Sequence, residues 1–526
     1  MKRIAGLAAL FLLLIAGTAI KFVPSDPADD PNDDDPAQAR ETGPRYLNRA
    51  FDAGHDWLQF ESVAAEGRPD QQHALSAANV SQLRIEWRLK LPEAIDGSPA
   101  YLSDVETDSG RFDVLFVNTT AGRLVALDAH LGGTIWIFDP PPGPRWTTSS
   151  PAVDPNRQFV YTYGLDGFVH KLRVYDGSEV LGDGWPELVT RKGSVEKGSS
   201  ALTIATAKNG RSYLYATTAA YPDPGDDGDY QGHVVAIDLG TGAQNVYNAA
   251  CSDKAMHFIE NGDASNDCEQ RQSGIWARSG VAYDPDTDRV FVTNGNGVYD
   301  ADRGGFNWGS SIVALRPDGS LDGGTPLDSY TPENYQQLTD DDLDLSSTTV
   351  AILPRGRNSK LPHLGVQGGK DWLLRLVNLR DLSGEGGPRH VGGELQIVKV
   401  AQGGEVLTRP ATWLEPETQQ PWLFVANPLG ISAYNVSLDE NGEPSMVMRW
   451  MKKTGGSSPI LANGVLYYAG NTGIRALDPK TGQQLWASRA TGDIHWSTPI
   501  VVNGTVYIGD TTGTITAYAI DSRPQN

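Results

Sequence analysis

The sequence predicts an all-β protein folded as an eight-bladed β-propeller of four-stranded antiparallel blades. A short module recurs along the chain, and two separate sets of positions each give eight units. The composition, with 58 Gly and 33 Pro, supplies many turns. After Ile20 no long segment has the 3.6-residue apolar periodicity of a helix. Repeated units that each hold four short strands are typical of propellers.

The repeated module is predicted to be two strands joined by a turn. Near its start the chain has LVALDAHLGGTIW, ending at Trp136, and near its end it has IRALDPKTGQQLW, ending at Trp486. Ala, Asp, Gly and Trp occupy the same offsets in both copies. The Asp can accept hydrogen bonds from the backbone that follows it, and Gly132 and Gly482 permit a positive φ at the corner.

Two sets of positions give the number of blades. Large apolar residues at or near the outer strand occur at Trp87, Trp136, Trp185, Val246, Leu321, Leu395, Trp450 and Trp486. New innermost strands begin after Ser98-Pro99, Ser150-Pro151, Ser200-Ala201, Ser279-Gly280, Ser347-Thr348, Arg409-Pro410, Ser458-Pro459 and Thr498-Pro499. The last unit is one strand short, so we expect the ring to be closed by the N-terminal strand in the C-terminal blade, which would cover two sheet edges.

The residues before the propeller are predicted to form two segments. Residues 1–20 begin with Lys2 and Arg3 and continue as an uncharged run, which indicates a signal peptide or an N-terminal anchor. Residues 21–50 are rich in Asp and Pro and are predicted to be a disordered linker. Residues 51–526 would form the propeller. We therefore expect an exported protein, periplasmic or extracellular, with anchoring to the membrane by the N-terminal segment left open.

The cysteine count restricts the cofactors. The chain has two cysteines, Cys251 and Cys268, and an exported protein would pair them, which stabilises the fold by roughly 3 kcal/mol. Two cysteines without a Cys-x-x-Cys-His motif predict no haem attachment and no zinc-thiolate cluster. No dinucleotide-binding fingerprint precedes a helix, so we expect no nicotinamide cofactor.

The formal net charge is -22, which opposes binding to nucleic acid and to anionic membrane surfaces. An anionic ligand would need local arginine or lysine side chains to overcome this field.

Several segments resemble the quinoprotein family, the eight-bladed propellers of alcohol dehydrogenases that depend on pyrroloquinoline quinone (PQQ) and their noncatalytic relatives. The repeat AxDxxTGxxxW resembles the family's structural signature, and the resemblance covers about residues 56 to 520. The segment GIWARSGVAYDPDTDRVFVTNGNGVYD is similar to the one in which the enzymes place a Trp beneath the quinone and an Asn on Ca2+. Those positions are Trp276 and Asn296 here.

Two further segments complete the resemblance. LTDDDLDLSS resembles the enzymes' approach to the next inner strand, which implies a catalytic aspartate at Asp342, with Asp344 as the alternative. VQGGKDWLLRLVNL resembles the segment whose Lys or Arg binds the quinone, which implies Lys370. In these roles Asp342 would also bind Ca2+ with Asn296, and Lys370 would stabilise negative charge on the reduced ring.

Two arguments from the residues accompany the resemblance. In a propeller the turn after a second strand and the connector before an innermost strand lie on one face, so Trp276, Asn296, Asp342 and Lys370 are all predicted there. Three arginines, Arg145, Arg278 and Arg409, precede inner strands and are predicted to hold the carboxylates of PQQ.

Structural interpretations of the same residues stay open. Asn296 can be an ordinary hairpin residue, Lys370 a solvated turn lysine and the acidic run an exposed loop. The sequence has no adjacent cysteine pair, and the blade before Trp276 offers Asp226, Asp227 and Asp229 where the enzymes supply a Glu ligand.

Two functions are therefore predicted as alternatives. One is a dehydrogenase that oxidises an alcohol or sugar with PQQ and Ca2+ and passes electrons to a separate acceptor. The other is a noncatalytic cell-envelope propeller that binds a protein or carbohydrate, as some relatives do in outer-membrane assembly.

Overall fold

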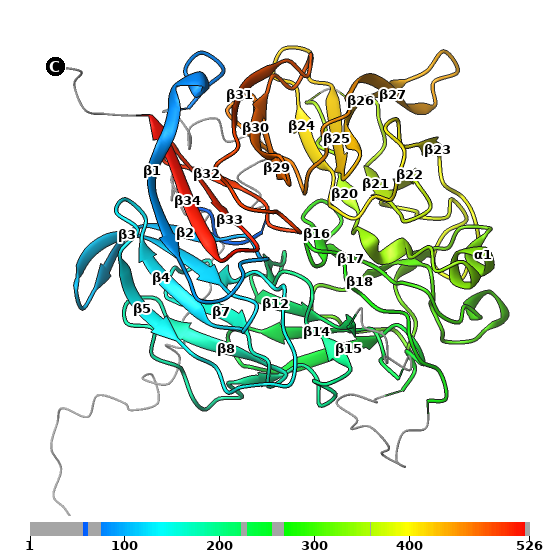
Figure 1. The fold of residues 1–526 in the computed structure, drawn as a ribbon. Coiled ribbons are helices and arrows are strands. Elements are labelled where there is room, and N and C mark those ends of the chain that lie inside the picture. Colours follow the sequence, from blue (N-terminus) through cyan, green and yellow to red (C-terminus); the bar gives the residue numbers. More distant parts are fainter. Residues whose placement is uncertain (1–55, 61–74, 222–228, 255–267, 358, 521–526) are drawn as a thin grey trace, which may run out of the picture. The chain divides into compact units, whose positions relative to one another are not determined.

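The computed structural model describes residues 56–60, 75–221, 229–254, 268–357 and 359–520, and these are almost entirely β-structure (Figure 1). Eight four-stranded antiparallel sheets are present, as the repeats predict, together with one short two-stranded pair. The predicted signal or anchor segment, residues 1–20, and the predicted linker, residues 21–50, lie outside the described residues. Within those residues, no helix has both the length and the apolar character that crossing a membrane would require.

Each blade is a four-stranded antiparallel sheet whose strands are here called A to D from the innermost outward; this is chain order in blades 1 to 7, and in blade 8 strand D is β1. Blades 1 to 4 comprise β2 (Ala100–Thr107), β3 (Gly110–Asn118), β4 (Leu124–Asp128) and β5 (Thr134–Phe138); β6 (Ala152–Val153), β7 (Phe159–Tyr163), β8 (Phe168–Arg173) and β9 (Glu187–Leu188); β11 (Thr203–Thr206), β12 (Ser212–Thr217), β14 (His233–Asp238) and β15 (Gln244–Asn248); and β16 (Ala282–Asp284), β17 (Arg289–Thr293), β18 (Ile312–Leu315) and β19 (Asp328–Tyr330).

The remaining blades follow the same order. Blades 5 to 8 comprise β20 (Ala351–Ile352), β21 (Leu364–Gly368), β22 (Leu373–Asn378) and β23 (Gln396–Lys399); β24 (Ala411–Leu414), β25 (Pro421–Asn427), β26 (Gly430–Leu438) and β27 (Pro444–Lys452); β28 (Ile460–Ala462), β29 (Val465–Gly470), β30 (Gly473–Leu477) and β31 (Gln484–Ser488); and β32 (Ile500–Val502), β33 (Thr505–Gly509), β34 (Thr514–Ile520) and β1 (Leu83–Lys90). Shorter elements are β10 (Glu196–Lys197), β13 (Ala219–Ala220), α1 (Tyr335–Asp340), η4 (Val80–Gln82), η5 (Ala301–Arg303) and η6 (Leu345–Ser347).

The outermost strand of blade 8 comes from the other end of the described chain. β1 pairs antiparallel with β34, from Leu83 opposite Ile520 to Lys90 opposite Thr514 (Figure 1). A bulge interrupts the ladder between Ile85 and Trp87. This pairing leaves neither β1 nor the outer edge of β34 unpaired.

Neighbouring blades are joined at the rim by a contact between an indole and a glycine. A Cβ atom added at Gly132, Gly177 or Gly482 would lie 2.6, 2.5 or 2.8 Å from the ring of Trp87, Trp136 or Trp450. Each of these tryptophans belongs to the blade before its glycine. The turn glycine of the module therefore serves two purposes, because it adopts a positive φ and also leaves room for the indole of the preceding blade.

The same indoles donate hydrogen bonds across the blade boundary. Their Nε1–H groups lie 2.9, 3.0 and 2.8 Å from the carbonyl oxygens of Ala129, Val174 and Pro479.

Three of the outer-strand positions predicted from the sequence lie outside strands, because Trp185 and Leu395 come just before β9 and β23 and Leu321 precedes β19.

A short segment before the first blade lies against the inner strands. Trp57 exchanges two backbone hydrogen bonds with Tyr101 of β2, at 2.9 and 2.7 Å. The Leu58 carbonyl accepts from Val153 of β6 at 2.8 Å, and the Gln59 side chain accepts from the Ile204 amide of β11 at 2.7 Å. Residues 56–60 thus cross the A strands of blades 1, 2 and 3.

The cysteine prediction is confirmed. Cys251 and Cys268 form a disulfide with their Cα atoms 6.0 Å apart. It joins two residues of the connector between blades 3 and 4, and residues 255–267 between them lie outside the described part of the chain.

Candidate functional site

The structure brings five of the predicted site residues together on one face. This candidate face is the end of the blades that carries the B–C turns and the connectors between blades. Trp276 lies in the connector before β16 and Asn296 in the segment after β17. Asp342 and Asp344 lie between α1 and η6, and Lys370 lies in the turn between β21 and β22. The site is therefore built from blades 4 and 5.

The Lys370 ammonium contacts the carboxylates of both Asp342 and Asp344. Lys370 Nζ lies 2.7 Å from Asp344 Oδ2 and 3.5 Å from Asp342 Oδ2. The same ammonium lies 5.4 Å from the centroid of the Trp276 ring, within the range of a cation–π interaction. The Lys370 backbone amide also donates to the Asp344 carbonyl at 3.1 Å, which fixes the turn against the connector.

Asn296 donates hydrogen bonds to the carboxylates of both Asp342 and Asp344. Its backbone amide donates to Asp344 Oδ1 at 3.0 Å, and its side-chain Nδ2 donates to Asp342 Oδ1 at 3.0 Å. A Cβ atom at Gly295 would lie 2.7 Å from Asp344 Oδ1, so the backbone can approach this carboxylate because residue 295 is glycine.

The remaining side-chain atom of Asn296 is without a partner. Its Oδ1 is buried and accepts no hydrogen bond within the part of the chain that the structure describes. Because buried polar atoms are almost always satisfied, an orphaned carbonyl oxygen beside two carboxylates is a candidate ligand for a cation.

Burial and the neighbouring charges have opposite effects on the pKa of Lys370. Burial lowers the pKa of Lys370, but the adjacent Asp344 and Asp342 carboxylates outweigh it, so that its pKa lies above the ordinary value. The ammonium is therefore charged throughout the neutral range. The two acids differ in exposure, since the Asp344 side chain is 16% exposed and that of Asp342 is 84% exposed.

Comparison with known sequences finds two kinds of relative. The profile of a family described as outer membrane protein assembly factor BamB matches residues 419–524. Quinohemoprotein alcohol dehydrogenase ADH IIB of Pseudomonas putida is 25% identical over 330 residues, which cover 57% of this chain and 44% of that protein. The dehydrogenase subunit of the alcohol dehydrogenase (quinone) of Gluconobacter oxydans is 24% identical over 433 residues, which cover 75% of this chain and 52% of that protein. The chain spans about half the length of these curated relatives.

Solved structures with the same fold include quinohemoprotein alcohol dehydrogenase ADHIIG of Pseudomonas putida HK5, with a TM-score of 0.59, 14% identity, and coverage of 90% of this chain and 81% of that one. A europium-containing methanol dehydrogenase gives a TM-score of 0.58 at 14% identity and covers 89% of this chain and 98% of that one. The chain is similar in sequence to quinoprotein alcohol dehydrogenases, matches the family profile over its C-terminal repeats, and shares the propeller fold of the solved structures. The predicted resemblance and the predicted fold are thus confirmed, whereas the roles of the site residues stay predictions.

Arg278 lies near the axis of this PQQ-like repeat propeller. Its Nη1 donates to Thr148 Oγ1 and to the Ser199 carbonyl, the latter at 3.3 Å. Its guanidinium carbon lies 4.6 Å from the centroid of the Trp496 ring. Blades 2, 3 and 8 therefore meet at an arginine supplied by blade 4. Burial lowers the pKa of Arg278 to about 10, opposed by the charge of Asp96, and the group remains a cation at neutral pH.

The other two arginines are placed differently. Arg145 lies 4.5 Å from the centroid of the Tyr221 ring and donates from Nε to the Ser194 carbonyl at 3.2 Å. Arg409 is half-buried and lies two residues before β24. These positions put both arginines on the candidate face, but the contacts described for Arg145 are with blades 2 and 3 rather than with Lys370 and its partners.

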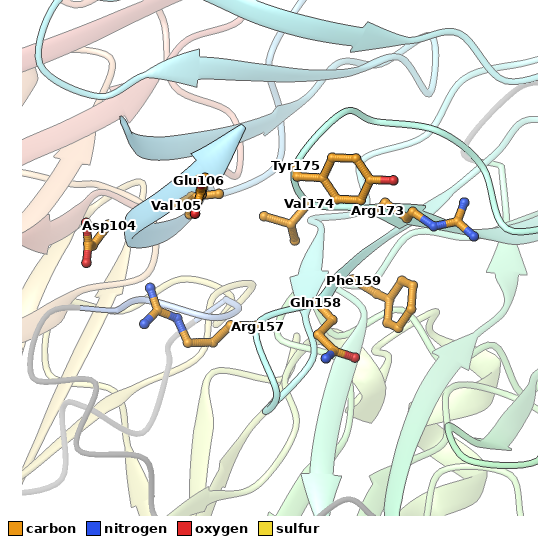
Figure 2. Close-up of a pocket in the computed structure, with 9 residues that line it drawn as sticks. All are labelled: Asp104, Val105, Glu106, Arg157, Gln158, Phe159, Arg173, Val174 and Tyr175. Atoms are coloured by element: carbon orange, nitrogen blue, oxygen red, sulfur yellow. The ribbon is translucent and has the colours of Figure 1, made fainter. Parts of the chain in front are cut away.

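Of two cavities, one lies on the face opposite the candidate site and the other on the candidate face itself. The larger, of about 460 Å³, lies between blades 1 and 2 at the opposite ends of the strands, because it is lined by the A–B and C–D turn regions that include Glu106, Arg157 and Tyr175 (Figure 2). The smaller, of about 230 Å³, lies on the candidate face between blades 5 and 6 and is lined in part by Trp372 and Leu429.

Sequence reasoning missed Asp96, which contacts two neighbouring residues of the candidate face. His495 Nδ1 lies 2.7 Å from Asp96 Oδ2, and the Trp496 amide donates to Asp96 Oδ1 at 2.9 Å. Asp96 stands just before Ser98, one of the residues that mark the start of an innermost strand. Its place just before an innermost strand could have marked Asp96 as a residue of this face. The pattern does not indicate which blade Asp96 contacts.

Proposed function

We propose that this PQQ-like repeat propeller is an exported dehydrogenase that oxidises an alcohol or sugar with bound PQQ and Ca2+ and passes the electrons to a separate acceptor. The observation that carries the proposal is the contact of Lys370 with Asp344, Asp342 and Trp276, side chains drawn from connectors and turns far apart in the chain. Turn chemistry alone does not require such a cluster. The Cys251–Cys268 disulfide supports an oxidising compartment outside the cytoplasm.

The oxygen atoms around Asn296 fit a partial calcium site. Ca2+ takes six to eight oxygen ligands, and Asn296 Oδ1 with the carboxylates of Asp342 and Asp344 would supply part of that number. No cluster of three or more His, Cys, Asp or Glu side chains suited to a metal occurs in the described ranges. The quinone and water would therefore have to complete the coordination. Asp229, the described member of the three acids before blade 4, instead pairs with Arg271 at 2.7 Å.

PQQ with Ca2+ would accept the hydride removed from the carbinol carbon of the substrate. The chain's own residues provide the other parts. The Trp276 ring offers an apolar floor, and the Lys370 ammonium offers a positive charge beside it. Arg278, a buried cation near the axis, and Arg145 on the same face are suited to the anionic groups of the cofactor.

Asp344 is the better-placed proton acceptor. Its carboxylate is held by the Asn296 amide on one oxygen and by Lys370 Nζ on the other, whereas Asp342 is largely exposed. A base that is already oriented loses little entropy on the way to the transition state. We propose that Asp344 takes the hydroxyl proton of the substrate and that Asp342 contributes to the binding of Ca2+.

Reconstitution tests this proposal. The purified protein is loaded with PQQ and Ca2+ and desalted, and quinone absorbance and alcohol-dependent dye reduction are then measured. Asp344→Asn should retain the quinone and lower kcat by about a hundredfold to ten-thousandfold, the usual range for a general base. Asp342→Asn should weaken the retention of Ca2+ more than it lowers kcat at saturating metal.

Asp341→Asn is the matched control, because this neighbouring acid is exposed and its described hydrogen bond is to Gln337, at 3.3 Å. It should leave retention and turnover unchanged. Failure of the wild-type protein to retain quinone at micromolar PQQ would refute the dehydrogenase proposal.

A second function is favoured by the family profile over residues 419–524, which hold β25 to β34. Under this alternative the propeller binds a protein or carbohydrate in the cell envelope without catalysis. Crosslinking in cells from an exposed residue of β27, such as Met448, would then capture a partner, and purified protein would show no quinone-dependent turnover.

A further inference from the structure

The cavity of about 460 Å³ between blades 1 and 2 lies at the ends of the strands opposite the candidate site (Figure 2). Its volume is within the range of complete small-molecule sites, which is about 300 to 1,000 Å³. None of its lining residues belongs to the candidate site. The proposed dehydrogenase reaction therefore gives this cavity no role.

An extension of blade 1 forms one wall of the cavity. The innermost strand β2 has eight residues, whereas the innermost strands of the other seven blades have two to four. A bulge between Leu102 and Val105 bends the strand, and Asp104 within it has a φ of +52°. The part of β2 beyond the bulge pairs with β3 and places Val105 and Glu106 on the cavity. The other blades fold without such an extension.

A second wall is a turn of blade 2 that departs from the repeat. In blades 1, 2, 3 and 7 the amide of the turn glycine donates to the carbonyl oxygen four residues before it, at 2.8 to 2.9 Å, so the four turns are equivalent. In blades 1, 3 and 7 the residue with this carbonyl is an aspartate whose carboxylate also accepts from a turn amide, and these residues are Asp128, Asp238 and Asp478. Blade 2 has Arg173 at this position.

The same turn of blade 2 carries an exposed aromatic ring. Tyr175 is 45% exposed, and the equivalent residues of blades 1, 3 and 7 are His130, Gly240 and Lys480. Asp176 takes over part of the work of the missing aspartate, since its carboxylate accepts from the Ser178 amide at 2.9 Å. Because the turn forms in three other blades without Arg173 and Tyr175, the fold does not require these two side chains. Both of them line the cavity.

Two of the four charged residues that line the cavity are held by partners outside it. Arg157 Nε lies 3.0 Å from Asp56 Oδ2, and Asp104 pairs with Arg111. A ligand would have to disrupt an ion pair to use either charge, so these two residues form the edges of the cavity.

The groups left to contact a ligand are both polar and apolar. Within the described residues neither Glu106 nor Arg173 forms an ion pair, and the hydrogen bond from Arg173 Nη1 to Ser178 Oγ, at 3.2 Å, uses one of its five N–H groups. Gln158 is exposed and adds an amide that both donates and accepts. The other lining side chains are apolar or aromatic, namely Val105, Phe159, Val174 and Tyr175.

The balance of charges indicates the class of ligand. The lining has two arginines and two acids, so its formal charge is zero and an ion of either sign gains little net attraction from it. A hydroxyl group can donate to Glu106 and accept from Arg173 at once. Lys171 Nζ lies 4.3 Å from the centroid of the Phe159 ring, so Tyr175 is the aromatic ring that offers a face to the C–H groups of a ligand.

We propose that this cavity binds a neutral saccharide, with the C–H face of one sugar ring against Tyr175 and its hydroxyl groups bonded to Glu106 and Arg173. The saccharide is bound here and not oxidised, because the candidate site lies at the other ends of the strands. The inference is therefore independent of the dehydrogenase proposal.

Saturation-transfer NMR on the purified protein with maltose, cellobiose and methyl α-D-glucopyranoside tests this inference. At least one of the three should receive saturation at its ring protons. Tyr175→Ala should weaken the binding about tenfold, because the stacking ring is lost. Arg173→Asp, which restores the residue of blades 1, 3 and 7, should weaken the binding by a similar factor while the denaturation midpoint equals or exceeds that of the wild type.

Two controls show whether the effect belongs to this cavity. Leu181→Ser should leave the binding unchanged, because Leu181 is 72% exposed on the same blade and does not line the cavity. The saccharide titration should also be the same with and without added PQQ and Ca2+, which would bind on the opposite face.

The outcomes separate this inference from the proposed function. If none of the three saccharides receives saturation, or if their binding survives both Tyr175→Ala and Arg173→Asp, the inference is overturned. Binding of glycyl-L-leucine in place of the saccharides, lost in the same two variants, would identify a site for zwitterions and would also overturn it. Failure of the protein to retain quinone would refute the dehydrogenase proposal and leave the saccharide titration unaltered.

Discussion

Around the rim, the indole of one blade lies on the turn glycine of the next at Trp87, Trp136 and Trp450, whereas the candidate face on blades 4 and 5 depends on residues that the repeat does not contain. The rim indoles donate hydrogen bonds to the next blade and lie against its turn glycine. The candidate face has an orphaned buried oxygen at Asn296 and a strained backbone at Trp372. The repeated indoles and glycines therefore join neighbouring blades, whereas the residues that do not repeat bring two carboxylates, an ammonium and the Asn296 side chain together.

The strongest test of the rim is Trp136→Ala. The substitution removes a nearly buried indole and its hydrogen bond to the Val174 carbonyl and leaves a cavity between blades 1 and 2. The free energy of unfolding should fall by about 3 to 5 kcal/mol, the usual range for Trp→Ala in a core. Urea denaturation followed by circular dichroism measures the loss. A change below about 1 kcal/mol would show that the rim contact is not a principal source of stability.

A matched pair of glycines separates the indole contact from the turn. Gly482 and Gly464 both have a φ of +68°, but a Cβ atom at Gly482 would lie 2.8 Å from the Trp450 ring and one at Gly464 would meet nothing within 4 Å. Gly482→Ala should therefore destabilise the protein by about 2 kcal/mol more than Gly464→Ala, because backbone strain is common to both. Equal denaturation midpoints would mean that the indole can shift without loss.

A buried rim carboxylate gives a pH-dependent effect. Burial raises the pKa of Glu187, in β9, from 4.5 to about 7, opposed by its hydrogen bond to Gln244 and by Lys171. Because the folded state holds this proton more tightly, Glu187 destabilises the fold as the pH rises through about 7. Glu187→Gln should raise the free energy of unfolding by about 1 to 2 kcal/mol at pH 8, and the gain should shrink as the pH falls and vanish below the ordinary pKa of 4.5. A gain that is independent of pH would contradict the raised pKa.

The smallest change in stability is expected on the candidate face. Asp344→Asn keeps an oxygen to accept from the Asn296 amide, and Lys370 retains Asp342 as a partner. We expect a loss of about 1 kcal/mol or less in the same urea experiment, although the activity should fall steeply. A loss of several kcal/mol would place Asp344 among the residues that hold the fold together and weaken the contrast with the rim.

Much of the candidate site could be predicted from the sequence, but not from spacing alone. The resemblance to the quinoprotein enzymes nominated Trp276, Asn296, Asp342, Asp344 and Lys370, and the order of strands and turns placed them on the same face. The choice between the two acids could not be made in this way. It depends on the turn after α1, where Asp342 has a φ of +55°. Both acids contact Asn296 and Lys370, but the Asp342 side chain is 84% exposed and that of Asp344 only 16%.

Other features depend on contacts that no local pattern encodes. Arg278 is recognisable as a cation before an inner strand, but its contacts with Thr148, Ser199 and Trp496 come from three different blades. The exposure of Trp372 and the cavity beside it also depend on Gly404 and Leu429, which precede and follow later strands.

The sequence by itself determined the all-β class, the eight blades and the pairing of Cys251 with Cys268, because turn residues, strand periodicity and a two-cysteine count are local or compositional signals. The tertiary structure decided which of the two acids beside Lys370 is the less exposed, which oxygen of Asn296 is left without a partner within the described residues, and where Trp372 points. Those outcomes depend on side-chain directions and backbone angles across blades. They depend on the distances between packed strands, and the repeat pattern in the sequence does not specify those distances.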